Sequence, residues 1–334
     1  MSEAFPLRGA SALVTGADGF IGSHLVERLV AEGCRVRAFC LYNSRGSAGW
    51  LDEAEPSVRA AVDLRLGDIR DARFVEAAMD GIEIAFHLAA LIAIPYSYIA
   101  AESFVDTNVG GTLNVLEAAR RKGVRRVIHT STSEVYGTPD VLPIVEDHPL
   151  RAQSPYAASK VAADQLCLAF HASYELPVVV LRPFNTFGPR QSDRAVVPTM
   201  LRQLLAGERE VRLGRLDPRR DLTYVADTVD GFVMASTAPG IDGRTIQLGT
   251  GQTTSIGDLF ALACRLLDVE ATAVEDPRRV RPVASEVLVL QSDPSLARRL
   301  LGWRPTTSLE DGLRSTIAWL RDHAEAVDPT RVQL

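Results

Sequence analysis

The feature that most constrains the fold is a glycine-rich turn placed directly between a predicted strand and a predicted helix. The β-branched run 11–15 leads into GADGFIG (16–22), and helical periodicity over 20–32 follows, with Leu25 and Leu29 on one face. Glycines in such a turn allow a tight bend, close approach of the backbone to a pyrophosphate and close packing of helix on strand, while the helix N-terminus offers free N–H groups to the anion. The turn occupies the first strand–helix junction of the chain, and this context predicts a dinucleotide site.

Short β-branched runs alternate with longer amphipathic stretches through the first half of the chain. Strands are predicted near 34–40, 62–66, 82–87, 125–130 and 177–182, and helices over 71–79, roughly 97–122 and 155–173. This alternation is typical of βαβ units. It predicts an α/β fold built on a Rossmann-like, doubly wound parallel sheet.

The second half is less regular, because prolines interrupt it and 245–248 is its clearest further β-branched run. We expect 1–184 to form the dinucleotide-binding domain and to carry the catalytic residues. We expect 185–334 to form a smaller, mixed α/β substrate-binding domain, with segments near 225–250 returning to the first domain. A C-terminal helix is predicted to begin at Ser308.

Charge and composition exclude several classes of partner. The 334 residues contain 36 Lys+Arg and 42 Asp+Glu, a formal net charge of −6, so no global basic field attracts nucleic acid or an anionic membrane. The four cysteines are too scattered for zinc-ligand or disulfide spacing, which predicts no metal and a reducing, cytoplasmic setting. No signal peptide is apparent, and the most hydrophobic stretch, 82–94, contains Glu83 and His87 and is too short to cross a membrane.

The end of the second predicted strand bears on the choice between NAD and NADP. An NAD site usually has a carboxylate there, which accepts a hydrogen bond from the ribose 2′-hydroxyl. The stretch 39–45 (FCLYNSR) contains no acid. Ser44 and Arg45 could instead hold a 2′-phosphate, so the sequence favours NADP over NAD, the alternative being that Arg45 is a solvated loop charge.

Two short motifs follow the fifth predicted strand. TSTSEVYG occupies 130–137, and PYAASK (155–160) places Tyr156 and Lys160 four residues apart on one face of a helix. A nearby ammonium favours the phenolate and lowers the pKa of a tyrosine from about 10, so that Tyr156 could take a proton from an alcohol. The Thr132 hydroxyl could hold the same alcohol oxygen and orient it for hydride transfer to a nicotinamide.

Glu134 is the discriminating residue of this set. Alcohol oxidation needs only Thr132, Tyr156 and Lys160, so a carboxylate two residues after Thr132 indicates a further proton transfer. The alternative interpretation is that Glu134 is a surface acid in a loop.

From about residue 10 to 320 the chain resembles the NAD(P)-dependent epimerase/dehydratase family of extended short-chain dehydrogenases/reductases. The resemblance is carried by the GxxGxxG turn, TSEVYG, SPYAASK and RPFNTFGPR (182–190). Within the family, 86–120 and 130–190 are most similar to nucleotide-sugar 4,6-dehydratases of the GDP-mannose or N-acetylglucosamine type.

This resemblance implies a reaction without net redox change. Tyr156 removes the proton of the hexose 4-hydroxyl while hydride passes to the cofactor, Glu134 takes the proton from carbon 5, water leaves from carbon 6, and hydride returns there. In dehydratases acting on dTDP-glucose the position before the glutamate is an aspartic acid, whereas here it is Ser133, as in the GDP-mannose type. The proton donor is therefore open: Ser133 could relay a proton, or Glu134 could return the one it collected.

The motifs and the resemblance together give a set of candidate site residues. Catalytic roles fall to Thr132, Ser133, Glu134, Tyr156 and Lys160, and Asn108 resembles the asparagine that supports the catalytic segment. The cofactor residues are Gly16, Gly19, Phe20, Ile21, Gly22, Asn43, Ser44, Arg45, Asp68, Ile69, Leu88, Ala89, Ala90, Thr130, Tyr156, Lys160 and Pro183. The substrate residues are Thr132, Ser133, Asn185, Arg190, Val196, Arg220 and Arg281, among which the arginines suit a diphosphate.

Alternative functions lie mostly inside the same family. A nucleotide-sugar 4-epimerase would not need Glu134, and a UDP-glucuronate-type decarboxylase shares TSEVYG but not the SPYAASK form of the tyrosine segment. A non-catalytic nucleotide-sensing protein is a distant alternative, because such proteins generally lose the Tyr-Lys pair. The resemblance also implies a homodimer through the 97–122 and 155–173 helices, whereas the base and hexose of the substrate are not readable from the sequence.

Overall fold

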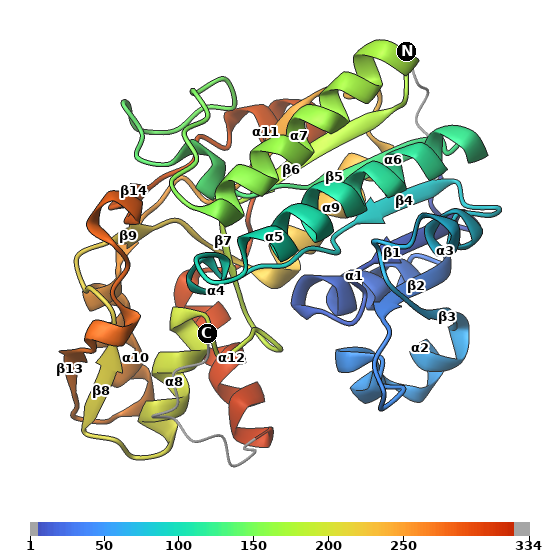
Figure 1. Cartoon of the computed structure of the whole chain (residues 1–334). Coiled ribbons are helices and arrows are strands. Elements are labelled where there is room, and N and C mark those ends of the chain that lie inside the picture. The colour runs from blue at the N-terminus through green and yellow to red at the C-terminus, as the bar shows by residue number, and fades with distance from the viewer. Residues whose placement is uncertain (1–5, 324–334) are drawn as a thin grey trace.

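The computed structural model of the chain describes residues 6–323, and a seven-stranded sheet runs through its larger part (Figure 1). All pairings in this sheet are parallel, in the order β11-β6-β5-β4-β1-β2-β3. The strands are β1 (Ser11–Thr15), β2 (Arg35–Leu41), β3 (Val62–Gly67), β4 (Ile84–His87), β5 (Arg126–Thr130), β6 (Val178–Pro183) and β11 (Thr245–Leu248). The doubly wound α/β fold predicted from the sequence is confirmed.

Helices cover both faces of the sheet (Figure 1). Leu25 and Phe232 belong to the core on one face, and Leu116 and Cys167 to the core on the other. The first face is covered by α1 (Phe20–Ala31), α9 (Val225–Thr237) and α11 (Ser295–Leu301), the second by α3 (Ala72–Ala78), α6 (Gly111–Lys122) and α7 (Pro155–Tyr174). No helix within residues 6–323 is both long and apolar enough to cross a membrane.

The stretch 97–122, predicted as one helix, is broken in the structure. It consists of α4 (Ile94–Ser97), α5 (Ala101–Phe104), a π-helical turn η2 (Val105–Gly110) and α6. α4 follows Ala93, whose φ of +75° lies in the left-handed region, and has Pro95 in its first turn. In the π-turn, Asn108 is buried and bonded to Leu91, so the interruption serves a side-chain contact that helical periodicity does not reveal.

The smaller part of the chain mixes helices with short strands, as predicted. Its separate core includes Leu201, Leu259 and Leu313 from three helices. These are α8 (Val196–Leu205), α10 (Ile256–Leu267) and α12 (Leu309–Asp322), of which α12 begins after the predicted cap Ser308. The short strands are β7 (Asn185–Phe187), β8 (Glu210–Leu213), β9 (Arg219–Arg220), β10 (Leu222–Tyr224), β12 (Thr254–Ser255), β13 (Thr272–Glu275) and β14 (Val289–Leu290).

Short helical turns complete the connections between these elements. They are η1 (Gly49–Glu53) and α2 (Pro56–Ala61) between β2 and β3, η3 (Ser133–Tyr136) after β5, and η4 (Pro277–Arg279) and η5 (Val283–Ser285) in the smaller part.

The order of the strands fixes where a ligand can bind. β2 and β3 lie on one side of β1, whereas β4, β5 and β6 lie on the other, so the direction of winding reverses between β1 and β4. In doubly wound sheets ligands bind at this reversal, beyond the carboxyl ends of the strands. The loops that leave β1, β4, β5 and β6 meet at that edge and carry the motifs singled out in the sequence.

Candidate active site

The turn after β1 forms a backbone cradle, closed by the segment after β4. Gly16 has a φ of +69°, and a Cβ atom there would lie 2.8 Å from the backbone nitrogen of Ala89. A Cβ atom on Gly22 would collide with the carbonyl of Gly16. The N-terminus of α1 has no side-chain cap, so its first N–H groups remain available to an anion. The cradle fits the pyrophosphate of a dinucleotide.

The end of β2 leads into a turn organised by Asn43. The side-chain carbonyl of Asn43 accepts hydrogen bonds from the backbone N–H groups of Arg45 and Ser47, both at 3.1 Å. Its amide donates to the backbone carbonyls of Leu41 and Ser47 at 3.2 and 2.8 Å. This leaves Ser44 and Arg45 exposed at the tip of the turn.

Asp68, which follows β3, points to a neighbouring arginine. Arg70 Nη2 lies 2.6 Å from Asp68 Oδ2, and this pairing lowers the pKa of Asp68. Ile69 is buried and sits against Gly111 at the start of α6, where a Cβ atom would lie 2.8 Å from the Ile69 side chain.

Thr132 and Glu134 are brought side by side at the end of β5. The Thr132 hydroxyl caps η3 by accepting a hydrogen bond from the backbone N–H of Glu134 at 3.2 Å. Ser133, between them, is only 2% exposed. Unlike the Ser133 side chain, the Glu134 carboxylate faces the smaller part of the chain, and its Oε1 lies 3.8 Å from Arg281 Nη1.

α7 begins as the sequence predicted, after the N-cap Ser154, and brings Tyr156 to the same place. The Tyr156 ring packs edge-on against Phe104 of α5, with ring centroids 6.1 Å apart. Its hydroxyl and that of Thr132 share a hydrogen bond. One end of α7 and the turn η3 therefore meet at two hydroxyl groups, as the alcohol-binding hypothesis requires.

Burial dominates the ionisation of Tyr156 and Lys160. It raises the pKa of Tyr156 to about 12, with Glu134 and Asp164 adding to the rise and the Thr132 hydrogen bond opposing it. Burial also lowers the pKa of Lys160, and Asp164 opposes that change. The expectation of a depressed Tyr156 pKa was wrong, because burial in low-dielectric surroundings outweighs the hydrogen bond with Thr132, which is the influence that lowers this pKa.

Asn108 joins the segment after β4 to α7. Its amide donates to the Ser159 hydroxyl at 2.9 Å and to the Leu91 carbonyl at 3.0 Å, and its carbonyl accepts from the Leu91 N–H at 2.7 Å. Ser159 directly precedes Lys160, so Asn108 holds the cofactor-side segment and the catalytic helix in one geometry.

A buried ion pair below the catalytic residues was missed by the sequence analysis. Asp164 is fully buried one turn beyond Lys160, and its Oδ2 accepts hydrogen bonds from Ser131 Oγ at 2.6 Å and from Arg182 Nη2 at 2.9 Å. Arg182 Nη1 donates to the Tyr136 hydroxyl at 2.9 Å. The available signal was spacing alone, because Tyr156, Lys160 and Asp164 recur every four residues.

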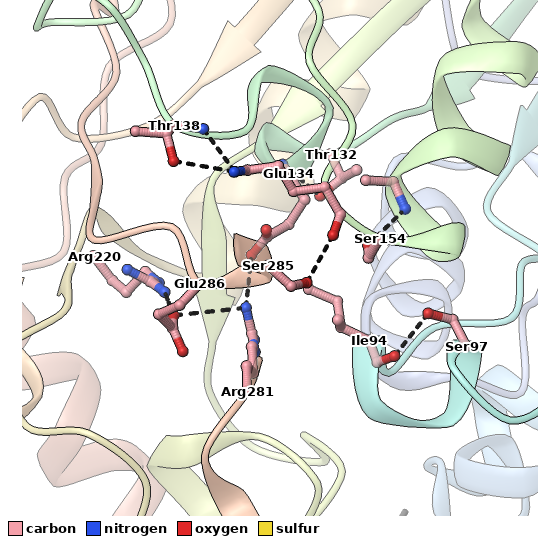
Figure 2. Close-up of polar contacts among 12 residues, drawn as sticks. Ile94, Ser97, Thr132, Glu134, Thr138, Ser154, Arg220, Arg281, Ser285 and Glu286 are labelled. Atoms are coloured by element: carbon pink, nitrogen blue, oxygen red, sulfur yellow. Dashed lines mark hydrogen bonds and ion pairs between the residues drawn. The ribbon is translucent and has the colours of Figure 1, made fainter. Parts of the chain in front are cut away.

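Two arginines from the smaller part, Arg220 and Arg281, interact with the Glu134 carboxylate. Glu286 lies between them, with Oε1 3.0 Å from Arg220 Nη2 and 3.9 Å from Arg281 Nη1 (Figure 2). Arg281 Nη1 is buried and makes no hydrogen bond within residues 6–323. The structure therefore brings Arg220 and Arg281 together, as the sequence predicted, and adds the acid Glu286, which no motif indicated.

A hydrogen-bonded bridge fastens this arginine segment to the larger part. The Ser285 hydroxyl lies 2.6 Å from the Tyr98 hydroxyl and donates to the Gln153 carbonyl at 2.7 Å. Gln153 precedes the cap of α7, and its own amide donates to the Ala284 carbonyl at 3.0 Å. The segment that carries Arg281 and Glu286 is thus tied directly to the start of the catalytic helix.

The other predicted substrate residues are more dispersed. Arg190 turns back to α1, where its guanidinium pairs with Glu27 at 2.7 Å and reaches Ser23 Oγ at 3.3 Å. Asn185 begins β7 and has a buried side-chain oxygen without a hydrogen-bond partner in the described residues. Val196 opens α8, and Thr130 and Pro183 end β5 and β6.

Two histidines lie behind the site and are neutral. His87 is hydrogen-bonded to Thr15 at 2.8 Å and to Thr112 at 3.0 Å. Burial lowers the pKa of His87 well below its ordinary value and that of His129 to about 4. Residues 6–323 contain no group of three or more His, Cys, Asp or Glu placed to hold a metal ion.

The chain is similar over nearly its whole length to enzymes of sugar-nucleotide metabolism. A family model described as GDP-mannose 4,6 dehydratase matches residues 13–316. A dTDP-glucose 4,6-dehydratase from Streptomyces griseus is 36% identical over 323 residues, covering 95% of this chain and 96% of that protein. A UDP-glucose 4-epimerase from Mycolicibacterium smegmatis is 35% identical, covering 94% and 99%.

The fold is equally similar to that of a solved relative. A crystal structure of a dTDP-glucose 4,6-dehydratase from Streptomyces venezuelae, with NAD bound, matches with a TM-score of 0.85 at 31% identity and covers 96% of this chain and 100% of that one. The near-equal identity to a dehydratase and an epimerase means that similarity does not decide between these activities.

Proposed function

This chain belongs to the NAD-dependent epimerase/dehydratase family of extended short-chain dehydrogenases/reductases, and from that premise we propose that it is a nucleotide-sugar 4,6-dehydratase. The reaction converts a nucleoside-diphosphate hexose into its 4-keto-6-deoxy derivative with loss of one water. The enzyme is accordingly a lyase rather than a net oxidoreductase.

The observation that carries this proposal is the place of the Glu134 carboxylate. Glu134 lies in the turn capped by Thr132, is near enough to Tyr156 to raise its pKa, and faces Arg281 of the smaller part. If Thr132 and Tyr156 hold the 4-hydroxyl and Arg281 holds the diphosphate, a carboxylate between them lies next to the hexose ring. A 4-epimerase has no proton transfer for such a base to perform.

In the oxidation step, Tyr156 takes the proton of the 4-hydroxyl, whose oxygen Thr132 holds. Lys160 stabilises the resulting phenolate charge from one helical turn away. A dinucleotide held at the turn after β1 would supply the hydride acceptor for carbon 4 and the hydride donor for carbon 6.

In the elimination step, Glu134 takes the proton from carbon 5, which the neighbouring 4-ketone has made acidic. The carbon 6–oxygen bond then breaks, and the leaving hydroxyl takes a proton and departs as water. We assign that proton to Glu134 rather than Ser133, because Ser133 is 2% exposed whereas the Glu134 side chain is 12% exposed and faces Arg281.

The residues present fit a nicotinamide dinucleotide at the turn after β1. Gly16 and Gly22 admit the pyrophosphate, and Ala89 closes the cradle behind it. NAD is the cofactor in the structure of the Streptomyces venezuelae relative. The sequence favours NADP over NAD for this chain, because Ser44 and Arg45 could hold a 2′-phosphate.

The proposed partners are a nucleoside-diphosphate hexose and a second copy of this chain. Arg220 and Arg281 would hold the diphosphate bidentately. Exposed apolar side chains lie on the stretch before and within α6, including Ile99, Val105 and Leu113. We propose that this face and α7 form a homodimer, which light scattering would report as about twice 36.2 kDa, and that residues 1–184 and 185–334 are the two domains of each subunit.

The test of the proposed function is the mass of the product. The purified protein is incubated with UDP-, GDP-, dTDP- and CDP-hexoses without added reductant, and products are analysed by mass spectrometry. Loss of one water, with no net change in the cofactor, is the expected result. An isomer of unchanged mass identifies an epimerase, and loss of carbon dioxide from a hexuronic acid identifies a decarboxylase; either result would overturn the proposal.

A further inference from the structure

The sequence lacks an acid at the end of β2, but the structure supplies one from another segment. Asp18, in the glycine-rich turn, directs its carboxylate to the last residue of that strand: Oδ2 accepts from the Leu41 backbone N–H at 3.4 Å. The ribose of a dinucleotide is recognised at this point in doubly wound folds, where a carboxylate accepts from the 2′-hydroxyl.

Backbone contacts fix the turn that holds Asp18. The Asp18 carbonyl accepts a hydrogen bond from the Trp50 N–H at 3.2 Å. Gly49 has a φ of +59°, and a Cβ atom there would lie 2.5 Å from the Asp18 carbonyl oxygen. The loop after β2 is therefore packed against Asp18 and restricts where its side chain can go.

A second carboxylate lies on the same side. Asp52 Oδ2 accepts from Ser47 Oγ at 2.6 Å and from the Ala48 N–H at 3.0 Å, which closes the loop on itself. Burial, with Asp18 and Asp52 adding to it, raises the pKa of the Cys40 thiol to about 12. Asp18 therefore lies at the end of β2 and Asp52 in the loop that follows it, so a 2′-phosphate at this point would add a third negative group.

Arg45, the residue that favoured NADP in the sequence, sits differently. It lies exposed at the tip of the Asn43 turn, two residues after Asn43 and four residues after Leu41, the last residue of β2. Asp18 and Asp52 both act on Cys40, next to the last residue of β2, whereas Arg45 is exposed in the turn that follows.

We propose that Asp18 is the specificity-determining residue of the cofactor site and selects NAD over NADP. The Asp18 carboxylate accepts the ribose 2′-hydroxyl of NAD, in place of the acid that other chains carry at the end of β2. A 2′-phosphate has no hydroxyl to donate and is repelled by Asp18 and Asp52. This inference rests on the proposed dinucleotide site and not on the dehydratase reaction.

Binding of the two dinucleotides tests the inference without reference to catalysis. The full-length protein is freed of any bound dinucleotide, which is identified by mass spectrometry, and then titrated calorimetrically with NAD and with NADP. The unchanged protein is expected to bind NAD at least about tenfold more tightly, as befits one hydrogen bond to a charged acceptor. Asp18→Asn should reduce that preference about tenfold, and Asp18→Ser provides a second, smaller replacement.

Two control variants separate the explanations. Arg45→Ala should leave both affinities unchanged, and Asp63→Asn removes an acid of β3 that is paired with Arg37 away from the turn. A preference for NADP that disappears in Arg45→Ala would overturn the inference, as would an unchanged affinity ratio in a folded Asp18 variant. Product analysis is independent of these titrations, so failure of the dehydratase proposal would be recognised separately.

Discussion

At the scale of single residues, Glu134 adds a carboxylate to the two hydroxyl groups proposed to bind and oxidise the substrate alcohol. Thr132 and Tyr156 share a hydrogen bond, and Glu134 stands beside them facing Arg281. In the proposed reaction, oxidation and elimination therefore use neighbouring but different residues. Substitutions should separate the two steps.

Glu134→Gln should stop the reaction between those steps. With a substrate that the parent enzyme accepts, the bound cofactor should still become reduced, which the absorbance of the reduced nicotinamide reports. The rate at which dehydrated product forms should fall by about a hundredfold or more. Glu117→Gln, an acid of α6 paired with Arg120, is the matched control. Product formation by Glu134→Gln at an undiminished rate would remove the residue from its proposed role.

Arg281→Ala should weaken nucleotide binding rather than chemistry. Its Nη1 is buried and makes no hydrogen bond in the described residues, with the Glu134 and Glu286 carboxylates 3.8 and 3.9 Å away, and we propose that it holds a diphosphate oxygen. Calorimetric affinity for UDP should therefore fall about tenfold or more and become less dependent on salt. Arg278→Ala removes an exposed arginine that is paired with Asp276 and should change neither property. Equal UDP affinities for the two variants would contradict the assignment.

At the scale of elements, α7 places the catalytic groups along one face. Its start could be predicted because Ser154 and Pro155 are local signals, and the pair Tyr156 and Lys160 followed from spacing. The partners of Asp164 could not, because Ser131 and Arg182 come from β5 and β6 and meet it only in the folded sheet. The break near Asn108 was missed for the same reason: a tertiary contact overrides helical periodicity.

Asp164→Asn should shift the pH dependence of cofactor reduction. Burial lowers the pKa of Lys160, and Asp164 raises it. Loss of that charge lowers the pKa of Lys160 further, so on the alkaline side the rate should begin to decline at a lower pH than in the parent. The other groups that interact with the Lys160 charge are Cys167 on α7, His87 on β4 and His129 on β5, all of which the variant retains.

The control for Asp164→Asn is a variant that also removes a buried, hydrogen-bonded carboxylate. Asp227→Asn removes another buried acid, which accepts from Thr306 and Thr307 at the other face of the sheet. It should not move the alkaline limb. Ser131→Ala should slow the reaction but leave the pH of the alkaline decline unchanged, because the charge of Asp164 is kept. An unshifted limb in folded, active Asp164→Asn would contradict this account.

At the scale of the whole molecule, the parallel sheet was predictable from alternation, and its reversal between β1 and β4 places every motif loop at one edge. The smaller part was predictable only in outline, because β8 with β13 and β9 with β12 and β14 are short pairings between distant segments. For the same reason the sequence could indicate Arg220 and Arg281 but not Glu286, which is recognisable only once β9 and the segment after η5 lie together.

Stability of the whole fold should fall as the pH drops from about 6.5 to about 4. His129 has its pKa lowered to about 4 and His87 well below its ordinary value, so both stay neutral in the fold while the unfolded chain takes up protons. Stability therefore rises with pH in this window, by up to roughly 3 kcal/mol for His129 alone. The free energy of unfolding, measured with denaturant at pH 5 and pH 7, should differ less between the two pH values in His129→Asn than in the parent. In the more exposed variant His323→Asn this difference should equal that of the parent. The same difference in all three proteins would contradict the burial of a neutral imidazole.

The most direct test of the central claim is the fate of the hydride from carbon 4. A nucleoside-diphosphate hexose carrying deuterium at carbon 4 is converted by the full-length enzyme, and the product is examined by mass spectrometry and NMR. The account predicts loss of one water and deuterium in the new methyl group at carbon 6, because the cofactor returns to that carbon the hydride that it took from carbon 4. Deuterium that returns to carbon 4 in a product of unchanged composition would contradict it and identify an epimerase.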